Sequence, residues 1–98
     1  MRVIKKDGSA VLYERGKIQL AIENANNDVE ENEKASDAEI ENIMCYIEDL
    51  GKKRILVEDI QDIIEQKLIE YGRNDLAREY VAYGYSDAKA NKIVQMRA

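Results

Sequence analysis

The sequence contains no histidine and only one cysteine among its 98 residues. Without histidine or paired cysteines, the chain cannot build a Cys/His zinc site, an internal disulfide or a histidine general base. The single thiol, Cys45, has no histidine that would activate it, and we interpret it as structural. The composition therefore argues against catalysis by the isolated chain.

Long apolar runs and proline are also missing. No run approaches the roughly 18 apolar residues of a membrane span, and no charged-then-apolar signal peptide opens the chain. No Pro-rich or Ser-rich linker, internal repeat or low-complexity tract divides it. A chain this short buries only about 60–65% of its unfolded surface, which leaves room for one core. We therefore expect one small cytoplasmic domain without a membrane partner, with any site on the rim of its core.

Acidic residues outnumber basic ones, 20 to 15, and the formal net charge is −5. This balance argues against a nucleic acid partner, which would need a dominant basic face. The positive charge is concentrated at the N-terminus, because residues 1–17 carry a net +3 and the remaining 81 residues carry −8. One compact anion therefore remains an acceptable ligand for the N-terminal segment.

Residues 2–13 have the pattern of a β-hairpin. Residues 3–4 and 11–13 are β-prone, and residues 7–9 between them suit a tight turn. From Arg15 the apolar spacing becomes helical, which predicts a first helix over about residues 15–27. Its expected apolar stripe consists of Ile18, Ile22, Ala25 and Val29.

A charged stretch, residues 30–36, separates the first helix from the second and is expected to be a solvated loop. Ser36 and Glu39 match a capping box at the start of the second helix. Gly51 follows the last apolar residue of this helix, where glycine commonly ends a helix. The expected buried stripe of the second helix is Ile40, Ile43, Met44, Ile47 and Leu50.

Residues 55–57 favour a short strand, and the acidic residues after them suit the first turn of a third helix, which Gly72 ends. A fourth helix is expected from residue 74 or 75 through Gly84, after which the pattern weakens. The expected buried stripe of the third helix is Ile60, Ile63, Ile64, Leu68 and Tyr71, and the fourth helix is expected to run through Leu76, Ala77, Tyr80 and Val81.

Together these elements predict a mainly α (α+β) fold, a four-helix bundle capped by a small N-terminal β-hairpin or three-stranded sheet. A hairpin alone is marginally stable, so we expect it to pack on the end of the bundle. The domain is expected to cover residues 1–85, with residues 86–98 as a tail or linker.

Lysines gather around the hairpin turn and the first helix. On a strand, Lys5 and Lys6 point to opposite faces, so one can face the bundle while the other flanks it. Lys17 lies in the first turn of the first helix, where unpaired N–H groups and the helix dipole already favour an anion. Two interpretations follow: a phosphate site without a Gly-rich loop, or solvated lysines that discourage edge-to-edge strand pairing.

The chain opens with Val-x-Lys-Lys-Asp-Gly, continues with Tyr-Glu and Lys-Ile, and later contains Ile-x-Val-x-x-Ile-Gln-Asp and Ala-x-x-Tyr. In this order and spacing the segments resemble the ATP-cone, a small regulatory nucleotide-binding domain found mostly at the N-terminus of ribonucleotide reductases. The matching positions extend over roughly residues 3–83: Val3, Lys5, Lys6, Asp7, Gly8, Tyr13, Glu14, Lys17, Ile18, Ile55, Val57, Ile60, Gln61, Asp62, Ala77 and Tyr80.

The resemblance implies that a purine nucleoside triphosphate, ATP or dATP with Mg²⁺, is held between the β cap and the helices. By position, Lys5, Lys6 and Lys17 would neutralise phosphates or lie along the nucleotide. Lysine suits this role because its ammonium is a compact charge that can follow a phosphate oxygen. The resemblance implies neither a catalytic residue nor a metal ligand on the protein.

At the other end of the nucleotide, the resemblance implies that Val3, Val57 and Gln61 line the base and sugar. Gln61 carries both a donor and an acceptor and can read the edge of an adenine, although a solvated helix residue is the simpler interpretation of it alone. Glu14 would accept a hydrogen bond from the base or a hydroxyl, or would simply favour the helix terminus.

Two departures from the family pattern affect these expectations. The usual Lys-Arg pair is Lys5-Lys6 here, which loses a planar guanidinium able to stack on a base or bind phosphate in bidentate fashion. Family members often end with Tyr-Arg and a second Arg shortly after, whereas this chain has Tyr83 followed by Gly84 and Tyr85. These departures bear on base selectivity and on docking to a catalytic domain.

The resemblance implies an allosteric regulatory domain and not an enzyme: ATP and dATP would compete for one site and shift how the domain packs on a reductase catalytic domain or in a homo-oligomer. The Tyr-rich fourth helix is most similar to the anaerobic, glycyl-radical class. One alternative is the nucleotide-sensing part of a transcriptional repressor of reductase genes, although the Cys pairs of its zinc ribbon are missing here. The other is a nonbinding helical module whose basic hairpin docks an acidic partner.

Overall fold

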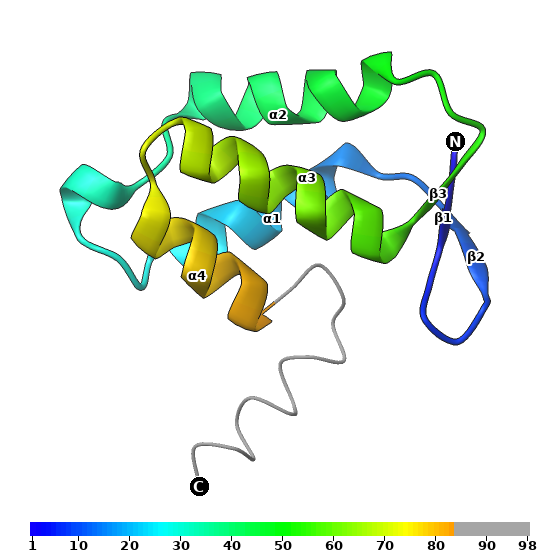
Figure 1. The fold of residues 1–98 in the computed structure, drawn as a ribbon, viewed down its shortest axis with the longest axis horizontal. Coiled ribbons are helices and arrows are strands. Elements are labelled where there is room, and N and C mark those ends of the chain that lie inside the picture. Colours follow the sequence, from blue (N-terminus) through cyan, green and yellow to red (C-terminus); the bar gives the residue numbers. More distant parts are fainter. Residues whose placement is uncertain (84–98) are drawn as a thin grey trace, which may run out of the picture.

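The computed structural model describes residues 1–83, which form a helical bundle with a small sheet at one end (Figure 1). The predicted mainly α fold with its three-stranded cap is confirmed. The predicted end of the fourth helix at Gly84, the domain boundary at residue 85 and the tail 86–98 lie outside the described residues. In chain order the elements are β1 (Arg2–Ile4), β2 (Ala10–Leu12), α1 (Arg15–Asn26), the 3₁₀ turn η1 (Glu31–Glu33), α2 (Asp37–Asp49), β3 (Arg54–Leu56), α3 (Val57–Glu70) and α4 (Asn74–Tyr83).

The sheet has β1 in its centre, in the order β2-β1-β3. β1 pairs with β2 as an antiparallel hairpin, with Val3 opposite Val11, and runs parallel to β3, with Val3 opposite Ile55. Because side chains alternate across a strand, this row turns toward the helices, where Val3 and Ile55 are buried and Val11 packs against the core. The sheet therefore closes the end of the bundle (Figure 1).

Apolar side chains from all four helices form the core of the bundle. They recur at the three- and four-residue spacing of a helix face, and each buried Leu or Ile contributes roughly 1.5–3 kcal/mol of transfer free energy. The bundle is thus held chiefly by aliphatic packing. The buried helical side chains are Ile18, Ile22, Ala25, Ile40, Ile43, Met44, Ile47, Val57, Ile60, Ile64, Leu68, Leu76, Ala77 and Tyr80.

The predicted burial of Leu50 is wrong, because this side chain is 38% exposed, and Val81 of the fourth helix is 47% exposed. Leu50 follows the last residue of α2, beyond the part of the helix that the core covers. Val81 follows Tyr80, which is fully buried, and successive helix residues point about 100° apart. Val29, Ile63 and Tyr71, from the other predicted stripes, are half-buried against the core.

The third strand and the connection before α2 also differ from the sequence prediction. β3 begins at Arg54, one residue earlier than predicted, and Val57 is the first residue of α3. The stretch 30–36 is not entirely loop, since it contains η1. The guanidinium of Arg73 fixes η1 in place by donating to the carbonyl of Asn32 at 2.9 Å.

Helix ends follow the sequence signals closely. The predicted capping box is present: the Glu39 N–H donates to Ser36 Oγ at 3.1 Å, and the Ser36 N–H donates to Glu39 Oε1 at 3.0 Å. Gly51 and Gly72 adopt φ values of 66° and 81° just past α2 and α3, a conformation that costs other residues energy. No helix within residues 1–83 is both long and apolar enough to cross a membrane.

Candidate functional site

The end of β1 and the beginning of α3 meet at the edge of the cap. The parallel register places Ile4 opposite Leu56, so the chain leaves β1 at Lys5 beside the point where Val57 starts α3. The hairpin turn is closed here by the Lys5 N–H, which donates to the Ser9 carbonyl at 2.8 Å. The pairing of β1 with β3 thus brings residues 5–9, here called the lysine turn, next to the N-terminus of α3.

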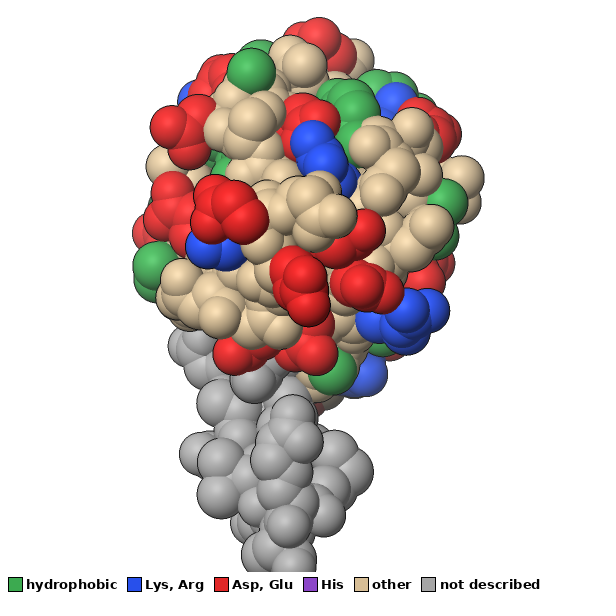
Figure 2. All heavy atoms as spheres, turned by 90° about the vertical axis from the view of Figure 1, so that its left-hand side faces the viewer, with side chains coloured by type: hydrophobic (Ala, Val, Ile, Leu, Met, Phe, Trp, Pro, Cys, Tyr) green, Lys and Arg blue, Asp and Glu red, His purple; other side chains and the backbone are tan. Residues whose placement is uncertain are grey.

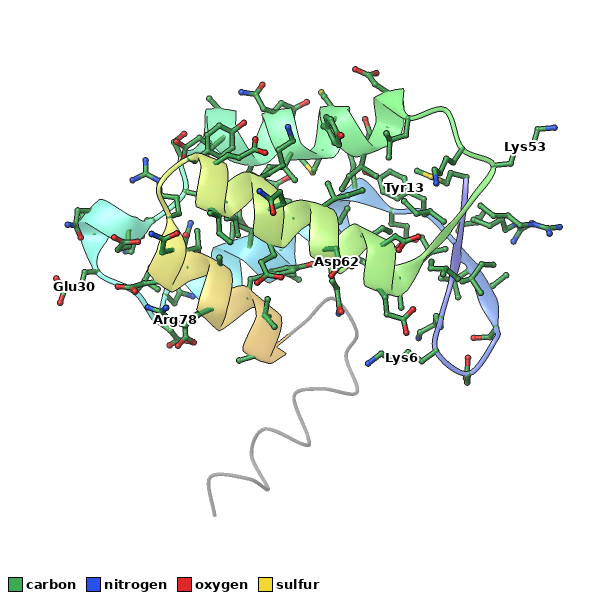
Figure 3. All side chains as sticks on the ribbon, in the orientation of Figure 1. Lys6, Tyr13, Glu30, Lys53, Asp62 and Arg78 are labelled. Atoms are coloured by element: carbon green, nitrogen blue, oxygen red, sulfur yellow. The ribbon has the colours of Figure 1, made fainter. Side chains whose placement is uncertain are left out.

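The predicted placement of Lys5 and Lys6 on a strand is wrong, because both follow the last residue of β1 and lie in the turn. The turn is fixed by Asp7, whose carboxylate accepts from the N–H and the hydroxyl of Ser9 at 2.9 and 2.7 Å. The hydrogen bond from the Ser9 hydroxyl lowers the pKa of Asp7 and keeps it ionised. In Figure 3 the Lys6 side chain extends from the turn toward the helices.

Neither Lys5 nor Lys6 forms an ion pair with another described residue, and both are exposed. Ammonium groups without a carboxylate partner are free to bind an external anion at no cost in broken ion pairs. The turn therefore presents two available cations beside α3.

Lys17 lies at the beginning of α1. The chain enters α1 from the end of the sheet opposite to the lysine turn. β2 runs antiparallel to β1, so Leu12 stands opposite Arg2 and α1 starts three residues later. The strands are only three residues long, so their two ends are about 7 Å apart along the strand. Lys17 Nζ lies 3.7 Å from Glu14 Oε1, and both side chains are more than half exposed.

Besides Lys17, the backbone at the N-terminus of α1 is also suited to an anion. Glu14 occupies the N-cap position with no side-chain hydrogen bond to the helix, and the first turn contains no acidic residue. The first N–H groups of a helix need partners from outside it, and the helix dipole makes them favour negative charge. The predicted role of Lys17 beside an anion is thus chemically consistent with its surroundings.

Gln61 lies one turn into α3, on the same face as Val57. Its Nε2 atom is buried and has no hydrogen-bond partner among residues 1–83. A buried donor without an acceptor costs about 1–3 kcal/mol, so such a group calls for an acceptor from a ligand or water. Val57, one turn before Gln61, and Val3 are both buried in the core.

These observations suit both ends of a nucleotide, the phosphates and the base. The free lysines of the turn suit phosphates, and the unpaired amide of Gln61 suits a base, which carries ring nitrogen acceptors. The register of β1 against β3 brings Lys5 and Lys6 beside Val57, the first residue of α3, and Gln61 follows Val57 by one helical turn, whereas Val3 is buried in the central strand. Glu14 and Lys17 are brought to the beginning of α1, at the other end of the short strands.

The opposite end of the molecule is acidic and unsuited to phosphates. Figure 2 shows many carboxylates on this end, and Figure 3 places Glu30 and Arg78 there, far from Lys53 of the cap. A hollow of about 590 Å³ opens on it, and carboxylates predominate among its charged groups, which would repel a triphosphate. Its lining residues are Asn27, Asp28, Val29, Glu30, Asp75, Arg78 and Glu79.

A hydrogen-bonded cluster around Arg15 attaches the beginning of α1 to α2. The Arg15 guanidinium donates to Glu48 at 2.9 and 3.1 Å and to Glu41 at 3.0 and 3.2 Å. The Tyr13 hydroxyl donates to Glu48 Oε2 at 2.8 Å. Because α1 begins at Arg15, this cluster also fixes the position of Lys17 one half-turn later.

Sequence reasoning did not find this cluster, although a signal was present. Glu41, Cys45 and Glu48 recur at four- and three-residue spacing and therefore share one face of α2. The Cys45 thiol donates to Glu41 at 3.4 Å, and this hydrogen bond raises the pKa of the thiol. A raised pKa leaves little reactive thiolate, in agreement with the structural interpretation of Cys45.

We expect Glu48→Gln to lower the free energy of unfolding at neutral pH by about 1 kcal/mol, because it weakens a charged hydrogen bond between α1 and α2. Hydrogen bonds from Arg15, and then from Tyr13, lower the pKa of Glu48 below the ordinary range of a glutamate. Its stabilising effect is therefore present above the unfolded pKa and is lost as the pH falls through the folded one.

Chemical denaturation at several pH values checks this expectation. The difference between wild type and Glu48→Gln should shrink on acidification, and a difference that is constant with pH would contradict it. Asp49→Asn is the matched control, since Asp49 is exposed at the end of α2 and makes no ion pair with a described residue.

The comparison with protein families agrees with the arrangement of cap, bundle and lysine turn. The model of the ATP cone domain matches residues 1–89, nearly the whole chain. Domains of this family have a nucleotide-binding, regulatory role and are not catalytic, and they occur typically in ribonucleotide reductases. The chain therefore belongs to the ATP-cone family.

Proposed function

We propose that this chain is an allosteric domain that binds ATP or dATP, with Mg²⁺ carried on the phosphates, and controls the activity of a ribonucleotide reductase in the cytoplasm. The observation that carries this proposal is the buried Nε2 atom of Gln61, which has no hydrogen-bond partner in the described part of the chain and lies one turn into the helix that starts beside the lysine turn. The proposed partner is the catalytic part of the reductase, of the anaerobic class by its Tyr-rich fourth helix, or another copy of the chain.

The phosphates would lie between the hairpin turn and α1. Lys5 and Lys6 supply cations that no described carboxylate neutralises, and Lys17 supplies a third at the open N-terminus of α1. A triphosphate that contacts both groups would join the cap to the bundle across the ends of the short strands. No set of three His, Cys, Asp or Glu residues in the described part of the chain could hold a metal, so the protein itself supplies no such Mg²⁺ site there.

The base and sugar would lie toward α3. The Gln61 amide would donate to a ring nitrogen and so recover the hydrogen bond that the free protein lacks. Val57 and Val3 would support the base from the core side, and Glu14 would accept from the sugar hydroxyl or the base. ATP and dATP differ by one hydroxyl, so regulation requires that this difference favour different packings of the domain on its partner.

Binding is tested first by thermal unfolding of the full chain with Mg-ATP, Mg-dATP and Mg-GTP in turn. A site saturated at about 100 times its dissociation constant adds roughly 2.7 kcal/mol, which raises the midpoint of a domain this size on the order of 10 °C. We expect this rise with the adenine nucleotides and a smaller one with Mg-GTP. No rise with either adenine nucleotide at saturating concentration would refute the proposal.

Residue roles at the phosphates are tested by Lys5→Ala and Lys17→Ala. Each variant should weaken triphosphate binding about tenfold or more, because a charged hydrogen bond is lost, and should leave adenosine binding nearly unchanged. Isothermal titration calorimetry with both ligands measures the two affinities. Lys34→Ala, at an exposed ion pair away from the turn, is the control, and equal losses for triphosphate and nucleoside would remove the lysines from the phosphate site.

Gln61→Leu separates a ligand-binding role of the amide from a structural one. Leucine has a similar size and no unpaired donor, so the free variant should be more stable than wild type by about 1 kcal/mol while it binds adenine nucleotide more weakly. Denaturation without ligand and titration with ATP measure these opposite effects. A variant that is destabilised without ligand and binds ATP as wild type does would show that the amide serves the fold alone.

A further inference from the structure

The lysines and arginines of residues 1–83 fall into two groups according to their partners. Those of the helical bundle each lie within 4.0 Å of a carboxylate: Arg15, Lys17, Lys34, Lys67, Arg73 and Arg78. Those of the cap form no ion pair with a described residue: Arg2, Lys5, Lys6, Lys52, Lys53 and Arg54. The lysine turn accounts for only two of this second group.

Arg2 and Arg54 are neighbours on the outer face of the sheet. They are direct partners in the parallel register, about 4.8 Å apart between strands, and both side chains are exposed. Like charges directly opposite each other destabilise a sheet, and no described carboxylate offsets this pair. An unneutralised pair of guanidinium groups is an arrangement that an external carboxylate would stabilise.

Lysines of the connector before β3 extend this positive surface. The Lys53 carbonyl accepts from the Arg2 N–H at 2.8 Å, so the connector lies along the same end of β1. Figure 3 shows Lys53 pointing away from the helices, and Lys52 is exposed beside it in the sequence. The positive surface therefore faces outward, whereas Lys6 extends toward the helices.

Aliphatic side chains complete the same face. Leu12 stands opposite Arg2 on the other side and is 62% exposed. The next row across the sheet is Ala10, Ile4 and Leu56, with Leu56 47% exposed. Adjacent leucines and arginines resemble the apolar centre and Arg-rich surroundings of a protein interface.

We propose that this outer face of the cap, defined by Arg2, Leu12, Arg54 and Leu56 with Lys52 and Lys53, docks an acidic amphipathic segment of a partner protein. Carboxylates of the partner would pair with Arg2 and Arg54 in the bidentate geometry that guanidinium favours. Aliphatic side chains of the partner would cover Leu12 and Leu56. This site is separate from the proposed nucleotide site, which lies on the inner side of the cap.

Charge complementarity favours a compact acidic protein segment over a larger polyanion. Nucleic acid and an anionic bilayer extend beyond the cap and would meet the −8 net charge of residues 18–98. A short segment can contact the cap alone. A second copy of the chain would have to bring its acidic end to the cap, a head-to-tail contact that does not close into a dimer.

The test uses a synthetic helical peptide that presents Glu and Leu along one face, and the same peptide with Gln in place of Glu. Fluorescence anisotropy at low ionic strength measures affinity, and amide chemical shifts of the labelled full chain map the contact. We expect the Glu peptide to bind about tenfold more tightly than the Gln peptide and to shift the amides of Arg2, Leu12 and Arg54.

Arg2→Ser/Arg54→Ser should weaken binding of the Glu peptide about tenfold, because the partner carboxylates lose their guanidinium groups. Lys34→Ser/Arg78→Ser removes the same charge from the helical bundle and should leave binding unchanged. The peptide should bind the full chain in the absence of any nucleotide, so that failure of nucleotide binding and failure of this proposal are separate results. Both double variants should unfold at or near the wild-type midpoint.

Several outcomes would overturn the proposal. These are equal affinity for the two peptides, equal losses in the two double variants, or shifts confined to the bundle. Tighter binding of duplex DNA or of phosphatidylserine vesicles would assign the face to one of those surfaces instead. Self-association that Arg2→Ser/Arg54→Ser abolishes in sedimentation would assign it to a second copy.

Discussion

The parallel pairing of β1 with β3 is the contact on which the rest of the structure depends. It joins the N-terminus to a segment more than fifty residues later and leads directly into α3. Through it, Val3 enters the core, Lys5 lies beside the start of α3, and Arg2 lies beside Arg54. A hairpin without this third strand would have no fixed position on the bundle, since two strands alone are marginal in water.

Helices and their ends could be predicted from the sequence because their signals are local. The Ser36–Glu39 capping box, the two glycines past α2 and α3, and most of the buried stripes depend on residues within one or two turns. The exposure of Leu50 could not be predicted in this way, because it depends on how far the packed core extends along α2. The beginning of β3 at Arg54 was missed for a related reason: its partner in the sheet, Arg2, is distant in sequence.

The candidate site was only partly accessible to sequence reasoning. Charge counting located the lysines, and the family resemblance supplied Gln61, Val57 and Val3. Neither could show that Gln61 Nε2 is buried without a partner from residues 1–83, because the burial of one atom depends on how all the elements pack. The Arg15 cluster joins residues about 30 positions apart, and only the Glu41–Glu48 spacing hinted at it. The net charge of −5 concealed the pattern that matters most: within residues 1–83, the cations without an ion pair all belong to the cap.

β1 also connects the two proposed binding surfaces. Its C-terminal end leads into the lysine turn, and its exposed face carries Arg2, so only two residues lie between the proposed protein contact at Arg2 and the proposed nucleotide contact at Lys5. A nucleotide that holds Lys5 and Gln61 together would alter the strength with which β1 is held against β3 and α3. Since the docking face is made by the same two strands, its affinity for a partner must then depend on the nucleotide. By thermodynamic linkage, the partner must change nucleotide affinity by the same factor. ATP and dATP can then regulate the partner differently only if they change its affinity for the docking face by different factors. Their own affinities for the nucleotide site do not decide this.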